Sequence, residues 1–190
     1  MAKANPLLAE LLPEHIVAIV DSREQMPFDL SPLRTVVDGL ATADYSVRGL
    51  ESHIAIERKS LEDLIGCIGV ERDRFERELS RLLAYPVRAV IVEASWDDLE
   101  AGNWRSKVTP ASAVGSVLGW ISSGVPFILA GNRDRAAKYT AKMLYLTARR
   151  KYRENRALVE SIEHVRRSPN AVAPETVNSF HVLESEGAAV

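Results

Sequence analysis

The chain reads Ile54-Ala55-Ile56-Glu57-Arg58-Lys59-Ser60-Leu61-Glu62-Asp63 at the point that decides its fold. The apolar start and charged end of this stretch predict a short β-strand, and Ser60 is a residue type that often begins a helix. Successive side chains of a strand point to opposite faces of a sheet. We therefore expect Glu57 and Lys59 to lie side by side at the end of the strand, with Arg58 on the other face.

Another carboxylate, Asp44, stands thirteen residues before Glu57. Asp44 and Glu57 could hold a hard divalent cation, because Mg²⁺ binds one or two carboxylates and takes water and phosphate oxygens as its other ligands. The ammonium of Lys59 could orient or deprotonate an attacking water, or neutralise charge on a phosphate. This set suits metal-assisted phosphodiester hydrolysis. The alternative for the same three residues is a cluster of surface ion pairs at a sheet edge.

Three further charged residues each have more than one possible role. Asp21, at the exit of a buried strand, could be a second metal-binding carboxylate or could bond to the loop after it. Asp63, three residues after Ser60, could complete a capping box, contribute to the site, or do both. Arg58 is expected to order the site by holding a carboxylate such as Asp63 or Asp44.

The remaining pattern predicts an α/β fold. Strands are expected at residues 15–21, 34–37 and 53–57, arranged as an antiparallel meander that brings the acidic residues to one edge of the sheet. Two more apolar strands, at residues 88–93 and 125–130, alternate with helices. These elements predict a mixed central sheet with helices on both faces.

Four residues are candidates for DNA contacts: Arg23, Arg74, Trp104 and Arg105. Guanidinium groups bind phosphates bidentately, and a tryptophan in a basic loop can stack on an unpaired base. The net charge of −2 does not indicate a nucleic-acid binder, but residues 133–156 are strongly basic. That segment could face phosphates or could be a solvated helix face.

The totals favour a globular protein, with 46% hydrophobic and 26% charged residues among 190. Cys67 is the only cysteine, so no intrachain disulfide can form. A reducing compartment is expected, the cytoplasm or, in a bacterium, the nucleoid. We expect no membrane span and no secretory leader, because no run of about eighteen apolar residues occurs.

The combination of Asp44, Glu57-Arg58-Lys59 and Asp63 resembles the GD…ERKxxxD signature of the XPF-type structure-specific endonucleases. These belong to the restriction-endonuclease-like PD-(D/E)xK superfamily. Asp21-Ser22-Arg23-Glu24 resembles the D-x-R-E that precedes the signature, and Arg74-Phe75 resembles the basic and aromatic pair that follows it.

The resemblance extends over about residues 15–153 and departs at Ala43, where the family usually has glycine. We accordingly expect an N-terminal arm at residues 1–14, a nuclease domain at residues 15–156 and a partly disordered C-terminal extension at residues 157–190. The fold implied is the α/β, restriction-endonuclease-like sandwich.

The resemblance implies a divalent-metal-dependent DNA endonuclease that cuts near flaps, forks or branches in DNA repair or recombination and leaves a 5′ phosphate and a 3′ hydroxyl. Its cofactor would be Mg²⁺ or Mn²⁺. The implied catalytic residues are Asp44, Glu57, Lys59, Arg58 and Asp63, and the implied metal ligands are Asp44, Glu57 and Asp21.

Family domains commonly pair, so a homodimer through the later helices is expected. No helix-hairpin-helix module is found after Arg153, so grip on DNA is expected from the basic helix or a protein partner. The alternatives are a non-catalytic DNA-binding scaffold and a restriction or recombination nuclease that acts on intact duplex.

Overall fold

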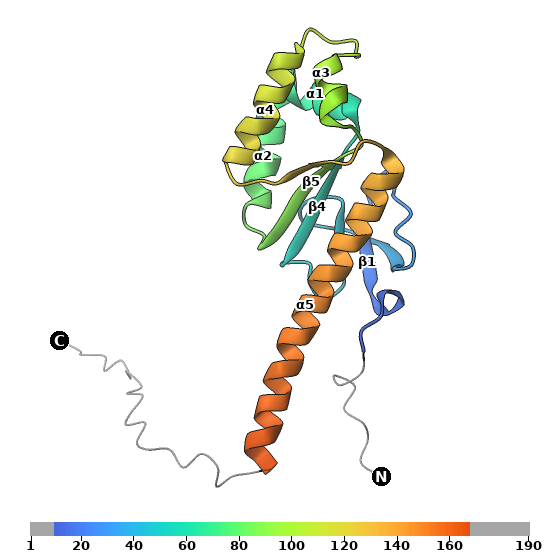
Figure 1. Cartoon of the computed structure of the whole chain (residues 1–190), viewed down its shortest axis with the longest axis vertical. Coiled ribbons are helices and arrows are strands. Elements are labelled where there is room, and N and C mark those ends of the chain that lie inside the picture. Colours follow the sequence, from blue (N-terminus) through green and yellow to red (C-terminus); the bar gives the residue numbers. More distant parts are fainter. Residues whose placement is uncertain (1–9, 168–190) are drawn as a thin grey trace, which may run out of the picture.

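A six-stranded mixed sheet forms the centre of the computed structural model, which describes residues 10–167 (Figure 1). β3 runs antiparallel to its neighbours β1 and β4, whereas β2 is parallel to β1, and β4, β5 and β6 are parallel to one another. In the spatial order β2-β1-β3-β4-β5-β6, the strands are β2 (Arg34–Asp38), β1 (Val17–Asp21), β3 (Tyr45–Val47), β4 (Ile54–Lys59), β5 (Val87–Val92) and β6 (Phe127–Leu129).

The expected antiparallel meander of residues 15–21, 34–37 and 53–57 is wrong in both connections, because β2 pairs with β1 alone and β4 pairs with β3 and β5. β2 lies at the edge of the sheet and runs parallel to β1, with Val17 opposite Arg34. A parallel pair needs a crossover of about a dozen residues, and residues 22–33 supply one, with Phe28 and Leu30 buried in the core. The antiparallel strand between β1 and β4 is the short β3.

Helices cover both faces of the sheet, as predicted. One face lies under α1 (Leu61–Ile68), α2 (Arg72–Leu82), α3 (Trp96–Ala101) and α4 (Pro110–Ser122). The other face lies under α5 (Arg133–Arg167) and the 22–33 loop. In Figure 1, α5 crosses the sheet on the face away from α1 to α4. A short 3-10 helix at Pro13–His15 precedes β1.

The side chains of β4 divide between the two layers. Ile54 and Ile56 belong to the core under α5, whereas Ala55 belongs to the core under α1 and α2. Burying each isoleucine contributes about 1.5–3 kcal/mol, so both layers fix the register of this strand. The charged end of β4 therefore has a defined orientation.

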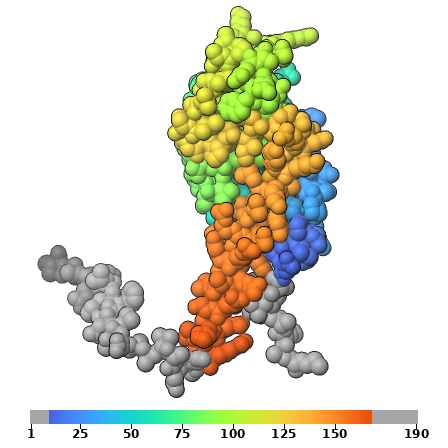
Figure 2. Space-filling model, in the orientation of Figure 1, coloured from blue at the N-terminus to red at the C-terminus, as the bar shows by residue number. Residues whose placement is uncertain are grey.

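The last helix is longer than the sheet it covers. Leu144 and Ala148 are buried against the sheet, while Leu158 is 60% exposed. α5 continues without a break past residue 156, the expected end of the nuclease domain. Figure 2 shows its far end standing clear of the body. Residues 1–9 of the expected arm and 168–190 of the expected extension lie outside the described residues.

None of the helices within residues 10–167 combines the length and the apolar character needed to cross a membrane.

Candidate active site

Three strand ends meet at one edge of the sheet. Because β3 is antiparallel to both neighbours, its start lies between the carboxyl ends of β1 and β4. The backbone N–H of Asp21 donates to Asp44 O (2.8 Å), and the N–H of Asp44 donates to Ile56 O (3.1 Å). This pairing places Asp44 beside Glu57, which confirms the predicted gathering of the acidic residues at one edge.

A cavity of about 650 Å³ opens at this edge, and we call it the β4 cleft. It contains most of the residues singled out in the sequence, together with acidic residues from the 22–33 loop and from just before α2. The lining residues are Arg23, Glu24, Gln25, Met26, Asp44, Glu57, Arg58, Lys59, Ser60, Asp63, Cys67, Glu71 and Arg74.

Asp44 is held by the main chain of β4. Its Oδ2 accepts a hydrogen bond from the backbone N–H of Arg58 at 2.7 Å. Burial and the neighbouring charge of Glu57 raise the pKa of Asp44 to about 7, although the hydrogen bond from Arg58 acts in the opposite direction. Asp44 thus binds a proton near neutral pH, and a positive charge placed beside it would favour the ionised form.

Glu57 and Lys59 lie side by side, as strand alternation predicts. Lys59 Nζ is 2.5 Å from Glu57 Oε1, 3.9 Å from Glu78 Oε2 and 5.1 Å from the centre of the Phe75 ring. Burial raises the pKa of Glu57, against the effect of Lys59. Burial alone would lower the pKa of Lys59, but the charge and hydrogen bond of Glu57 raise it above its ordinary value. Lys59 is therefore an ammonium at neutral pH, suited to binding a phosphate and poorly suited to deprotonating water.

Arg58 points to the opposite face, as predicted, but its expected partners are wrong. Its side chain contacts neither Asp63 nor Asp44; it pairs with Glu93 (2.5 Å) and Glu24 (3.4 Å). Only the backbone N–H of Arg58 reaches Asp44. The cause is tertiary, since Glu93 follows β5, the parallel neighbour of β4, and lies on the same face as Arg58.

Sequence reasoning missed Arg133 and Glu93. Arg133, the first residue of α5, donates to Glu93 Oε1 (2.9 Å) and to the carbonyls of Met26 (2.7 Å) and Pro27 (2.8 Å). Glu93 thereby bridges Arg58 and Arg133 and connects the 22–33 loop to β4. No local pattern marks either residue, because the partners are 35 and 40 positions apart in the sequence.

Asp63 takes the capping position and also faces the β4 cleft. Its backbone N–H donates to Ser60 Oγ (3.1 Å), and Ser60 Oγ donates to Asp63 Oδ2 (2.7 Å). These bonds satisfy groups at the start of α1 that would otherwise lack partners. The structure therefore supports the capping role and leaves one carboxylate oxygen available to the cleft.

Asp21 is near the site but does not line the β4 cleft. Its carboxylate accepts hydrogen bonds from Arg23 Nε (2.6 Å) and Nη2 (3.1 Å) and from the backbone N–H of Leu40 (2.7 Å). Burial alone would raise the pKa of Asp21, but these bonds lower it. The observed contacts match the loop-bonding alternative and give Asp21 the task of orienting Arg23.

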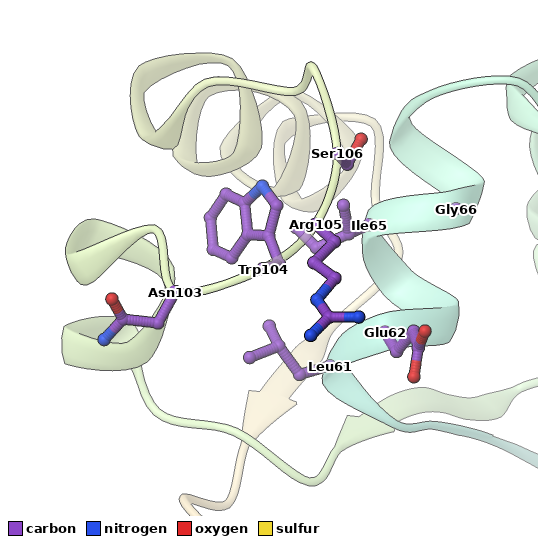
Figure 3. Close-up of a pocket in the computed structure, with 8 residues that line it drawn as sticks. All are labelled: Leu61, Glu62, Ile65, Gly66, Asn103, Trp104, Arg105 and Ser106. Carbon is purple, nitrogen blue, oxygen red and sulfur yellow. The ribbon is translucent and has the colours of Figure 1, made fainter.

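The four DNA-contact candidates separate into two places. Arg23 and Arg74 line the β4 cleft, where they pair with Asp21 and Glu71. Trp104 and Arg105 line a different cavity, on the other side of α1 (Figure 3).

Two small residues bear on the geometry of the β4 cleft. Ala43, the departure from the family signature, has a φ of 66°, a left-handed conformation that glycine adopts without strain. Cys67 is buried in the wall of the cleft, and burial raises the pKa of its thiol to about 11.

The cleft fits a metal ion that takes few protein ligands. Within residues 10–167, no three histidine, cysteine or acidic side chains are grouped as a complete metal cage. The partly buried Asp44 and the buried Glu57 each have a raised pKa, caused mainly by burial, and the charge of Glu57 adds to the effect on Asp44. Mg²⁺ and Mn²⁺ suit such a site, because they accept water and phosphate oxygens for the rest of their coordination.

A mixed sheet with helices on both faces and an acidic and lysine cluster at its strand ends defines a nuclease domain of the restriction-endonuclease-like class. The family model for the ERCC4 domain matches residues 20–143. The chain therefore belongs to the ERCC4 domain family, and its domain is of the XPF type.

Two solved structures share this fold. XPF from Aeropyrum pernix is 20% identical, with a TM-score of 0.57 over 69% of this chain and 61% of that chain. XPF from Aeropyrum pernix in complex with DNA is 19% identical, with a TM-score of 0.58 over 70% of this chain and 65% of that chain. The chain thus spans less than two thirds of either structure. A search of curated sequences gives no match.

Proposed function

We propose that this protein is a divalent-metal-dependent DNA endonuclease that cuts near branches or flaps. The observation that carries the proposal is the meeting of Asp44, Glu57 and Lys59 in one cleft, where two carboxylates repel each other beside an ammonium. Family membership supports the nuclease class, and a solved structure with a similar fold is in complex with DNA.

Asp44 and Glu57 would hold Mg²⁺ or Mn²⁺. Burial and the charge of Glu57 raise the pKa of Asp44, and a dication would favour its ionised form, so binding and deprotonation are coupled. When bound, the metal would polarise a phosphate oxygen and lower the pKa of a bound water. Asp21 would act indirectly, by holding Arg23 at the rim.

The protein's own groups would position the substrate. Lys59, as an ammonium, would neutralise charge on the scissile phosphate and orient the attacking water. The N–H of Arg58 would keep Asp44 in place, and Asp63 would fix the start of α1. Arg23 and Arg74 would exchange their carboxylate partners for flanking phosphates. The water oxygen bonds to phosphorus as the bond to the 3′ oxygen breaks, leaving a 5′ phosphate and a 3′ hydroxyl.

The test is cleavage of labelled DNA by the purified protein with Mg²⁺ or Mn²⁺, compared with EDTA and with Glu57→Ala. Matched substrates are a flap, a fork, a four-way junction and plain duplex. The proposal predicts metal-dependent cutting that is lost in the variant and favours the branched forms. Equal cutting of plain duplex would indicate a restriction or recombination type of nuclease. DNA binding that is indifferent to metal and to Glu57→Ala, without cutting, would indicate a scaffold.

We also propose a homodimer, on the basis of the family resemblance. Leu118 and Ile121 of α4 are exposed, as a surface in contact with a second copy would require in the isolated chain, and Leu146 is exposed on α5, over the other face of the sheet. Molar mass by light scattering tests this directly. A monomer at all concentrations would contradict it and favour a protein partner that supplies grip on DNA.

A further inference from the structure

A second cavity, of about 640 Å³, lies between α1 and the loop before α4. We call it the α1 groove. Leu61, Ile65 and Gly66 of α1 line one wall, and Trp104 and Arg105 line the other. Figure 3 shows Arg105 extending from its loop towards the first turn of α1, with Trp104 beside it on the same loop. The α1 groove thus places apolar side chains next to the guanidinium group of Arg105.

The α1 groove is next to the β4 cleft. Ser60 and Asp63 line the cleft, while Leu61 and Glu62, in the same turn, line the groove. The two cavities are therefore separated by about one helix width, which is about 10 Å. A DNA strand held in the cleft could reach the groove within a few nucleotides.

The loop that lines the groove carries basic side chains whose charges are not neutralised by ion pairs in the described part of the chain. Neither Arg105 nor Lys107, two residues further along the loop, has an ion-pair partner within residues 10–167. By contrast, Arg23 and Arg74 at the cleft are both paired. Glu62 is the acidic side chain of the groove lining and stands on the α1 side, so a phosphate would approach from the loop side.

Trp104 is held in a fixed orientation. Its Nε1 donates to Val108 O at 2.9 Å, and its ring packs partly against the core under α1 to α4. Asn103 and Ser106 add hydrogen-bonding groups to the lining. Single-stranded nucleic-acid sites combine an apolar or aromatic platform for a base with cations for the backbone, and the α1 groove has both.

We propose that the α1 groove binds an unpaired nucleotide of the DNA substrate, with its base against Leu61, Ile65 and Trp104 and its phosphate at Arg105. This inference rests on the proposed function and deepens it. Bases within intact duplex are stacked and cannot enter. The groove would therefore select DNA that has single strand next to duplex.

Gly66 provides a steric test. Gly66 lines the groove, and a Cβ added there meets no atom within 4 Å, so the larger side chain of Gly66→Leu would begin in open space. Replacing a glycine inside a helix also favours the helix by up to about 1 kcal/mol, so the variant should fold. Gly115→Leu is the matched control, because Gly115 is a helical glycine in α4 with equally open space and lies outside the groove.

The experiment measures binding by fluorescence anisotropy in EDTA, with a blunt duplex and with the same duplex carrying a single-stranded overhang. Gly66→Leu is expected to weaken overhang binding about tenfold and to leave blunt-duplex binding unchanged within about twofold. Gly115→Leu should change neither. Equal effects on both DNAs, or no effect on the overhang, would overturn the inference.

Arg105→Ala separates the phosphate contact from the base contact. It should lower the slope of log K against log salt for a single strand by about 0.7, the value for one lost phosphate contact. An unchanged slope would remove Arg105 from the proposal. Since binding is measured without metal, these results are independent of the cleavage assay, so failure of the groove and failure of the nuclease are distinguishable.

Discussion

The two cavities beside α1 have nearly the same volume, about 650 and about 640 Å³, but differ in how their charges are satisfied. In the β4 cleft, Lys59 pairs with Glu57, Arg23 with Asp21 and Arg74 with Glu71. In the α1 groove, Arg105 has no ion-pair partner within residues 10–167. The contrast teaches that the proposed reaction cleft holds its charged groups in place through ion pairs, while the proposed nucleotide groove leaves its cation available to a ligand.

The difference between the two cavities is tested most strongly by removing the ammonium group of Lys59 from the β4 cleft. Lys59→Ala should lower the cleavage rate about a thousandfold, because a group that stabilises charge on the phosphate is lost. Overhang binding in EDTA should change little, since the α1 groove is intact. Single-turnover cleavage measures the loss, with circular dichroism to check folding. Arg81→Ala, at an exposed site on α2 outside both cavities, is the control. Rates within tenfold of the parent would contradict the role of Lys59.

The next effect concerns Asp44 in the metal-free cleft, where burial and repulsion by Glu57 both disfavour its charged form. The pKa of Asp44 is raised from 3.8 to about 7, so between these values the folded state binds more protons than the unfolded state. The free energy of unfolding in EDTA should therefore fall as pH rises from about 4 to 7, by on the order of 3 kcal/mol. Asp44→Asn should flatten this profile and stabilise the metal-free protein at pH 8.

Urea unfolding across this pH range measures the effect, and added Mn²⁺ provides the second readout. Mn²⁺ should raise the melting temperature of the parent above pH 7 and leave Asp44→Asn unchanged. A parent whose stability does not depend on pH between 4 and 7 would contradict the repulsion, and an equal response to Mn²⁺ in both proteins would contradict the metal site.

The ion pairs at the cleft include those of Glu93 with Arg58 and Arg133, and their contribution to stability can be tested separately. Glu93→Gln removes the charge that Arg58 and Arg133 share and should destabilise the protein by about 2 kcal/mol, because the largely buried guanidinium of Arg58 and the partly exposed one of Arg133 lose a charged partner. Denaturant unfolding measures the loss. Glu160→Gln, which breaks an exposed pair with Arg156, should cost no more than about 0.5 kcal/mol. Similar losses in both variants would contradict the importance of burial.

The smallest expected effect concerns the backbone conformation of Ala43, next to the β4 cleft. Ala43→Gly should stabilise the protein by about 1 kcal/mol, because glycine relieves the left-handed φ of 66°. Ala41→Gly, in the same bend but without a positive φ, should be neutral or destabilising. Thermal unfolding compares the two. A lower melting temperature for Ala43→Gly would show that the observed conformation is not strained.

Local features of the site were predictable from the sequence. Strand alternation placed Glu57 and Lys59 together and Arg58 opposite, and the helix start at Ser60 followed from its capping preference. Each of these depends on neighbours within a few residues. The family signature added Asp44, whose place beside β4 is fixed by the pairing of β3.

Features that depend on distant partners were not predictable. Apolar alternation is the same in a parallel and an antiparallel strand, so the direction of β2 could not be inferred. The partners of Arg58 come from β5 and the 22–33 loop, and only the assembled sheet brings them together. The α1 groove likewise joins two segments about forty residues apart, Leu61–Gly66 and Asn103–Ser106.

The single cysteine has a practical consequence for spectroscopy. Cys67 is 1% exposed and its pKa is about 11, so at pH 7 roughly one thiol in ten thousand is ionised. Such a thiol reacts slowly with maleimides. A new cysteine at an exposed site, for example Ser106→Cys on the rim of the α1 groove, should therefore accept a fluorophore selectively in the otherwise native sequence. The label would then report the arrival of a DNA strand in real time.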